Sequence, residues 1–287
     1  MVIPCRRLDL DKRHIEEYAD ALMAAAHKIG DHGLTKTEFW KTGLFRSAIE
    51  TLRGRQAASM RKKKDFLAEV LDHMKSLGCV RSWAFTGAGE RHDYEIDLGK
   101  GRTVVFEAKG CLDGNNTNIF QRPPNADEFF IWSLCQNPGA DPGHNAWSGI
   151  HTRLGATLVA EKQRIDGLVI WDMVCGTEGR PCPKLAAEPD RGVRLASGKV
   201  VPPPCIYMFP RTIPDPRNNP DPPVWRIEDV KFLKALGEVF GVREDEVTQV
   251  GILARMHGAD VQRRTVLLRS GVVVGESGWT TVARAVR

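Results

Sequence analysis

The residues best suited to chemistry lie in one predicted β-hairpin, over positions 91–110 (RHDYEIDLGKGRTVVFEAKG). Residues 93–98 alternate strictly between polar and apolar, and a second strand at 102–109 follows a glycine-containing loop of three residues. Because side chains alternate between the two faces of a strand, Glu107 and Lys109 share one face and the apolar residues of that strand occupy the other. The apolar faces of both strands need a common core, so their charged faces must coincide.

The register of this hairpin decides which aspartate faces Glu107. Leu98 pairs with Arg102 across the loop, and counting back along both strands places Asp93 opposite Glu107. Directly opposed side chains have Cβ atoms about 5 Å apart. Asp97 lies four residues along the strand, at about 13 Å. We therefore expect Asp93 to be the partner of Glu107, with Asp97 taking its place if a bulge shifts the pairing.

Two carboxylates this close repel each other unless a cation lies between them. Carboxylate oxygens, backbone carbonyls and waters are the ligands that Mg²⁺ prefers, so Asp93, Glu107 and the carbonyl of Ala108 form a predicted Mg²⁺ site. Lys109 lies farther along the same face, where it can neutralise a phosphate oxygen or orient the attacking water. Metal, phosphate and water together indicate hydrolysis of a phosphodiester, with Asp93, Glu107 and Lys109 as the catalytic residues.

Periodicity places this hairpin within a mixture of helices and strands. The predicted N-terminal helices cover residues 11–29, 35–52 and 57–77. A strand at 79–85 precedes the hairpin, helical segments at 126–136 and 147–163 follow it, and 167–174 reads as a buried strand. A strand–helix–strand crossover after an antiparallel hairpin predicts an α/β fold, a mixed central sheet flanked by helices.

Residues 181–223 are rich in proline and hold 12 of the 17 prolines of the chain. This composition predicts a loop-rich insertion, interrupted by a short strand at 205–209. A helix at 227–240 follows, and then two or three late strands at about 247–254, 264–269 and 271–275. These strands either extend the same sheet or form a small accessory unit. The predicted organisation is an N-terminal helical region (1–56), a core (57–175) and a C-terminal α/β extension (176–287) packed on the same domain.

The chain resembles the PD-(D/E)xK nuclease superfamily. The resemblance rests on Asp93, Glu107, Ala108 and Lys109 and on the element order helix–strand–strand–strand–helix–strand around them. The chain looks most like the restriction endonucleases of that superfamily, and the resemblance covers roughly residues 57–174. It implies an αβββαβ core and a Mg²⁺-dependent, sequence-specific endonuclease of type II that cuts double-stranded DNA. Such enzymes commonly act as homodimers whose two-fold symmetry matches a palindromic site.

The resemblance also suggests roles for two further residues. An acidic residue of the preceding helix sometimes assists the metal in this superfamily, and Glu69 is the candidate here. His92 stands where the family often has proline.

Polar and basic segments flank the predicted site. Asparagine can read adenine edges, and arginine can read guanine or hold phosphates. The candidate DNA contacts are Asn115, Asn116, Asn118 and Arg122 in the loop after the hairpin, and Arg153 at the start of the next helix. A polar turn without a ligand is the alternative for this loop. The basic run at 61–64 is either a solvated helix face or a phosphate contact.

Composition excludes several classes of protein. Lys and Arg number 41 against 36 Asp and Glu, a net charge of +5, which permits a polyanionic partner without requiring one. No apolar run approaches about 18 residues, and the N-terminal stretch is charged where a signal peptide is apolar. Seven cysteines without a CxxC pair fit free thiols in a reducing compartment. We therefore expect a cytoplasmic protein that does not associate with membranes, and the resemblance to restriction endonucleases implies a prokaryotic one.

Other functions remain open. The sequence contains neither a P-loop nor a glycine-rich dinucleotide fingerprint, so no nucleotide cofactor is expected. Repair, recombination or modification-dependent nucleases on the same core are the closest alternatives. A DNA-binding module with a vestigial hairpin is the alternative outside the enzymes.

Overall fold

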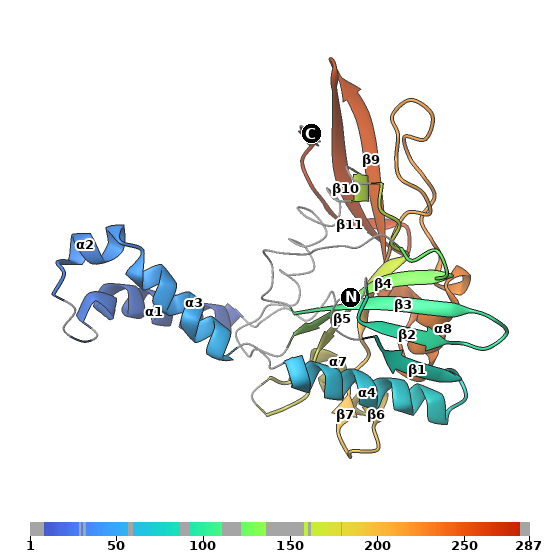
Figure 1. The fold of residues 1–287 in the computed structure, drawn as a ribbon, viewed down its shortest axis with the longest axis horizontal. Helices are drawn as coiled ribbons and strands as arrows, with labels where there is room; N and C mark the ends of the chain where they lie inside the picture. Colours follow the sequence, from blue (N-terminus) through green and yellow to red (C-terminus); the bar gives the residue numbers. More distant parts are fainter. Residues whose placement is uncertain are drawn as a thin grey trace.

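A mixed ten-stranded sheet is the centre of the protein (Figure 1). The computed structural model describes residues 9–28, 30, 33–56, 60–86, 92–110, 122–135, 158–159, 162–178 and 180–281. In order across the sheet, the strands are β1 (Ser82–Phe85), β2 (Tyr94–Asp97), β3 (Thr103–Gly110), β4 (Glu128–Cys135), β5 (Gly167–Asp172), β8 (Cys205–Met208), β9 (Thr248–His257), β10 (Asp260–Arg269) and β11 (Val272–Glu276). The tenth strand, β12 (Thr280–Thr281), pairs with β10.

Strand directions confirm the predicted mixed α/β sheet. β1, β2 and β3 form an antiparallel meander, whereas β3, β4 and β5 run parallel. β8 is antiparallel to β5 and joins β9 in parallel through two residue pairs. The late strands therefore extend the same sheet, and in Figure 1 they rise from it as a tall arm.

The helices fall into two groups. α4 (Met60–Ser76) and α7 (Pro183–Ala187) lie below the sheet in the view of Figure 1, and α8 (Lys231–Val239) shares a core with α4. α1 (Asp9–Ala25), α2 (Lys36–Lys41) and α3 (Leu44–Gln56) lie to one side of the sheet. Short 3-10 turns and one small hairpin complete the structure: η1 (Ala26–Lys28), η3 (Pro189–Arg191), η4 (Ile227–Asp229), η5 (Glu244–Glu246), β6 (Val193–Arg194) and β7 (Val200–Val201). No helix in the described part of the chain is long and apolar enough to cross a membrane.

The helix expected at 35–52 is interrupted. Thr35 forms the predicted capping box with Glu38, and α2 begins there. The helix then ends at Thr42, and α3 starts a new one. Gly43 adopts a φ of +75°, a left-handed conformation that terminates helices.

Two hydrophobic cores cover the two faces of the sheet. The first joins α4 and α8 to the sheet, and its largest sheet residues are Trp132 and Trp171, whose rings stack at 5.9 Å. The second lies on the opposite face and includes Val105, Phe129 and Ile252. Because the central strands are covered on both sides, their sequences are almost continuously apolar.

The prediction of a helical segment at 126–136 is wrong, because Glu128–Cys135 form the strand β4. Every residue of β4 is buried except Ser133, which is half-buried. A short apolar run that is covered on both faces has no periodicity to separate strand from helix, and its aromatic residues favour a strand. The helix expected at 147–163 lies mostly outside the described residues; Leu158 and Val159 are helical, and 162–166 are not.

The expectation of free thiols is wrong for Cys135, which is fully buried and disulfide-bonded. A disulfide requires two Cα atoms within about 4.4–6.8 Å. That proximity is a property of the fold, so the spacing of cysteines along the sequence could not reveal it.

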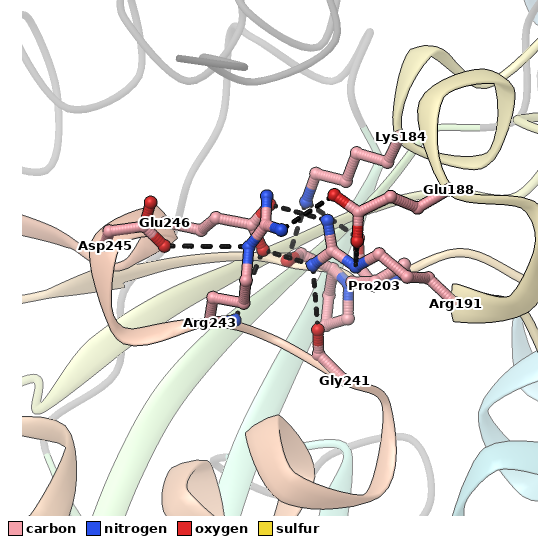
Figure 2. A network of polar contacts seen from close by, with 9 residues as sticks. Lys184, Glu188, Arg191, Pro203, Gly241, Arg243, Asp245 and Glu246 are labelled. Carbon is pink, nitrogen blue, oxygen red and sulfur yellow. Dashed lines mark hydrogen bonds and ion pairs between the residues drawn. The ribbon is translucent and has the colours of Figure 1, made fainter.

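A polar network ties the proline-rich insertion to the C-terminal extension (Figure 2). Arg191 donates two hydrogen bonds to the carboxylate of Glu246, at 2.9 and 2.6 Å, and a third to the carbonyl of Gly241 at 2.8 Å. Arg243 contacts Glu188 at 2.7 Å. The hydrogen bonds from Arg191 hold the pKa of the Glu246 carboxyl below its usual value, against the effect of burial. These arginines have a structural role.

Glu128 fastens α8 to the sheet. Its carboxylate accepts hydrogen bonds from the backbone N–H groups of Lys231 at 2.8 Å and Phe232 at 2.9 Å, and it lies 3.4 Å from Arg102 Nε. Glu128→Ala would leave both donors and the guanidinium without this partner, so we expect a loss of about 3 kcal/mol of unfolding free energy. Urea denaturation checks this value. Glu128→Gln keeps an acceptor oxygen and should lose less; an alanine variant as stable as the wild type would contradict the assignment.

Candidate active site

The hairpin of β2 and β3 has the predicted register. Tyr94 pairs with Phe106 and Asp97 with Thr103, and the N–H of Leu98 bonds to the carbonyl of Arg102 at 3.0 Å. The strand pairing ends at Tyr94, and Asp93 is the next residue towards the N-terminus.

Just beyond the last pair of the ladder, Asp93 connects the start of β2 to β3 through both its side chain and its backbone. Its Oδ2 accepts a hydrogen bond from the N–H of Ala108 at 2.8 Å, and its own N–H donates to the carbonyl of Phe106 at 3.1 Å. The carboxylate therefore lies against the backbone between Glu107 and Lys109.

Asp97 has a different role. Its Oδ1 accepts the N–H of Gly99 at 2.6 Å, and Arg81 Nη1 lies 3.7 Å from its other oxygen. The side chain thus supports the hairpin turn, at the far end of the strands from Glu107. No bulge shifts the β2–β3 pairing, so the fallback of Asp97 as the metal ligand has no support in this geometry.

Glu107 is a buried carboxylate with one cationic neighbour. It is 7% exposed, and its Oε1 lies 2.5 Å from the Nζ of Lys109. Burial raises the pKa of the Glu107 carboxyl, the ammonium of Lys109 opposes this effect, and the charge of Asp93 adds to it. Glu107 shares its strand face with Val105, so this face holds part of the second core next to the charged residues.

The donor set fits Mg²⁺. Asp93 and Glu107 supply carboxylate oxygens, and the carbonyl of Ala108 points to the same edge of β3 as its N–H, beyond the last residue of β2. Among the described residues, no cluster of three or more His, Cys, Asp or Glu side chains could hold a metal. Two carboxylates and a carbonyl suit a cation that keeps several waters, whereas Zn²⁺ prefers nitrogen and sulfur ligands.

Glu69 is not brought to this pair. It accepts a hydrogen bond from Ser197 Oγ at 2.8 Å, and within the described part of the chain no polar contact joins it to Asp93 or Glu107. The reason is geometric, because α4 packs on the face of β3 that carries Phe106, whereas Glu107 faces the other way.

The start of α4 lies close to the first residue of β2. Lys64 Nζ lies 3.7 Å from the ring centroid of Phe85, and the centroid of that ring lies 5.3 Å from that of Tyr94. Tyr94 is the first residue of β2 and follows Asp93. Lys64, the last residue of the basic run at 61–64, therefore lies at the end of the sheet where Asp93 lies.

The predicted DNA contacts are described only in part. Asn115, Asn116, Asn118 and Arg153 lie outside the described residues. Arg122 donates from Nε to the carbonyl of Ala126 at 2.9 Å, and its Nη1 lies 3.4 Å from Asp166.

His92 is a further candidate residue of the active site. In the sequence it stood out only because it occupies the position where the family often has proline. It is 8% exposed, and neither ring nitrogen has a hydrogen-bond partner among the described residues. Its Nε2 lies 3.8 Å from Glu95 Oε2. The sequence pointed to His92 only through its position next to Asp93, and that position does not reveal that the His92 side chain is buried.

The raised pKa of Glu107 has a consequence for metal binding. The carboxyl must be ionised to bind a cation, so binding should be lost as the pH falls through a value above the ordinary 4.5. Isothermal titration with Mg²⁺ across pH 4–8 measures this midpoint. Lys109→Met removes the ammonium that lowers the pKa, so its midpoint should lie at a higher pH than that of the wild type. A lower midpoint in Lys109→Met would contradict the assignment.

Comparison with known proteins adds no relative. No protein-family model matches the chain, and neither does a curated protein or a solved structure.

Proposed function

We propose that this protein is a Mg²⁺-dependent endonuclease that hydrolyses phosphodiester bonds in double-stranded DNA, a type II restriction enzyme of the PD-(D/E)xK superfamily. The observation that carries the proposal is the hydrogen bond of 2.8 Å between Asp93 and the N–H of Ala108. The Asp93 carboxylate contacts the backbone of the residue between Glu107 and Lys109, which supports the predicted triplet.

The order of elements supports a restriction-endonuclease-like core. α4 is followed by the antiparallel meander of β1, β2 and β3, and the next strands run parallel to β3. The difference from the expected αβββαβ order is the additional strand β4, where a helix was expected. Residues 122–127, the described part of the connection before β4, contain no helix.

Each residue of the site has a defined role in this proposal. Asp93, Glu107 and the carbonyl of Ala108 would hold the cation, which when bound neutralises phosphate charge and makes water more acidic. Lys109 is partly exposed and holds its ammonium at Glu107, from where it can contact a phosphate oxygen or orient water. A homodimer would present one such site to each strand of a palindromic sequence.

Digestion of plasmid and phage DNA tests the proposal. We expect discrete fragments with Mg²⁺ and intact DNA when EDTA is added. A smear would indicate a non-specific nuclease, and cleavage of methylated DNA alone would indicate a modification-dependent one. DNA that is bound but never cut would identify a binding module and contradict the enzymatic proposal.

A further inference from the structure

A cationic pocket lies between the segment that precedes β4 and the segment that precedes β5. Its volume is about 280 Å³, close to the lower end of pockets that take small organic ligands, about 300 Å³. Three cationic side chains line it, Arg122, Lys162 and Arg164, and no carboxylate does. The charge and volume of the pocket therefore suit an anion of the size of a phosphodiester.

Arg122 is held in place at this pocket. Its Nε bonds to the carbonyl of Ala126 at 2.9 Å, and its Nη1 lies 3.4 Å from the carboxylate of Asp166. Asp166 is buried and also accepts the N–H of Phe129 at 2.7 Å, so its position is fixed. Among the residues that the structure describes, none accepts a hydrogen bond from Nη2 of Arg122. A guanidinium that is already oriented loses little conformational freedom when it binds an anion.

Lys162 and Arg164 supply charge that no described residue neutralises. Both are exposed, and neither forms an ion pair with any residue that the structure describes. Asp166 offsets the charge of Arg122, so the pocket keeps the two charges of Lys162 and Arg164. Lys162 also adopts a φ of +53°, a region that residues other than glycine seldom occupy outside functional sites.

The pocket lies on the same face of the sheet as Glu107. Ala126 packs in the same core as Val105, which shares the strand face of Glu107. The N–H of Asp127 bonds to the carbonyl of Thr103 at 2.8 Å, so the pocket is level with the start of β3. Glu107 is four residues farther along, about 13 Å.

We propose that this pocket binds a backbone phosphate of the DNA duplex, separate from the phosphodiester held at Asp93 and Glu107. The inference rests on the proposed nuclease function and adds a binding site to it. Lysine and arginine contact phosphates without reading bases, so the pocket contributes affinity and position along the duplex, and no sequence preference.

Two charge-matched double variants test this site. Lys162→Gln/Arg164→Gln removes the two unpaired charges of the pocket. Lys75→Gln/Arg81→Gln removes two exposed charges near the C-terminal end of α4 and leaves the pocket intact. Binding of a fluorescent duplex is measured with Ca²⁺ in place of Mg²⁺ over about 50–200 mM salt. The pocket variant should bind about tenfold more weakly on every sequence, with a salt slope shallower by about 1 to 2. The control should stay within about twofold of the wild type.

The outcomes separate this inference from the proposed function. If the wild type binds and cuts DNA and the pocket variant binds as the control does, the pocket inference is overturned and the nuclease proposal stands. If the wild type binds no duplex, both fail. A thermal-shift arm with inorganic phosphate identifies a free-phosphate site: stabilisation of the wild type alone, with unchanged DNA affinity in the pocket variant, would also overturn the inference.

Discussion

Lys109→Ala should reduce cleavage by at least about 10²- to 10³-fold while DNA binding is retained. The ammonium of Lys109 is the only cationic group within hydrogen-bond distance of Glu107 among the described residues, at 2.5 Å. Removing it takes away the positive charge that can stabilise the transition state beside the carboxylates. The measurement is single-turnover cleavage of a plasmid together with the affinity for a labelled duplex.

Two controls make this result specific. Lys234→Ala removes an exposed lysine of α8 and should cut as the wild type does. The assay is repeated at alkaline pH, which favours the ionised form of Glu107, so that weakened metal binding is not mistaken for lost catalysis. If Lys109→Ala cuts at the wild-type rate at that pH, the assignment of Lys109 is wrong.

Glu107→Gln should abolish cleavage and, in the absence of metal, stabilise the fold. Folding raises the pKa of Glu107, so its contribution to stability is present at acid pH and lost as the pH rises through the folded value. A neutral isostere avoids this loss, and we expect a gain of up to about 1 kcal/mol at pH 8 that disappears at acid pH. Thermal unfolding of the wild type and the variant at both pH values measures the difference.

Mg²⁺ should reverse the order of these two proteins. A cation that binds the folded state raises the unfolding temperature of the wild type, and the variant lacks one of its two carboxylate ligands. Glu95→Gln is the matched control, because Glu95 lies on β2 and its side chain is 45% exposed. Should Mg²⁺ stabilise Glu107→Gln as much as the wild type, Glu107 would not be a ligand.

The hairpin could be predicted from the sequence because its determinants are local. Strict alternation defines both strands, and Gly99 and Gly101 supply the left-handed turn, with φ of +80° and +71°. The register follows from the loop length, so the approach of Asp93 to Glu107 needed no tertiary information.

The remaining features depend on contacts between distant segments. β4 could not be distinguished from a helix because its run of buried residues lacks periodicity. Glu69 was misplaced because the sequence does not tell which face of the sheet α4 covers. The pocket of Arg122, Lys162 and Arg164 forms only because β4 and β5 are parallel neighbours, which brings the segments before them together.

The arginines of the chain serve two purposes. Arg191 and Arg243 hold the insertion and the C-terminal extension together, and the buried Arg269 bonds to Thr248 at 2.8 Å. Arg164, by contrast, is exposed and forms no ion pair within the described ranges.

Cleavage by Asp93→Asn and Asp97→Asn, measured side by side on one plasmid, tests the central claim most directly. The two substitutions are chemically identical and lie on the same hairpin, but only Asp93 contacts the backbone between Glu107 and Lys109. We predict that the wild type and Asp97→Asn cut with Mg²⁺, that EDTA stops both, and that Asp93→Asn does not cut in either condition. Equal cleavage by Asp93→Asn, or uncut plasmid with the wild type in every buffer, would contradict the account.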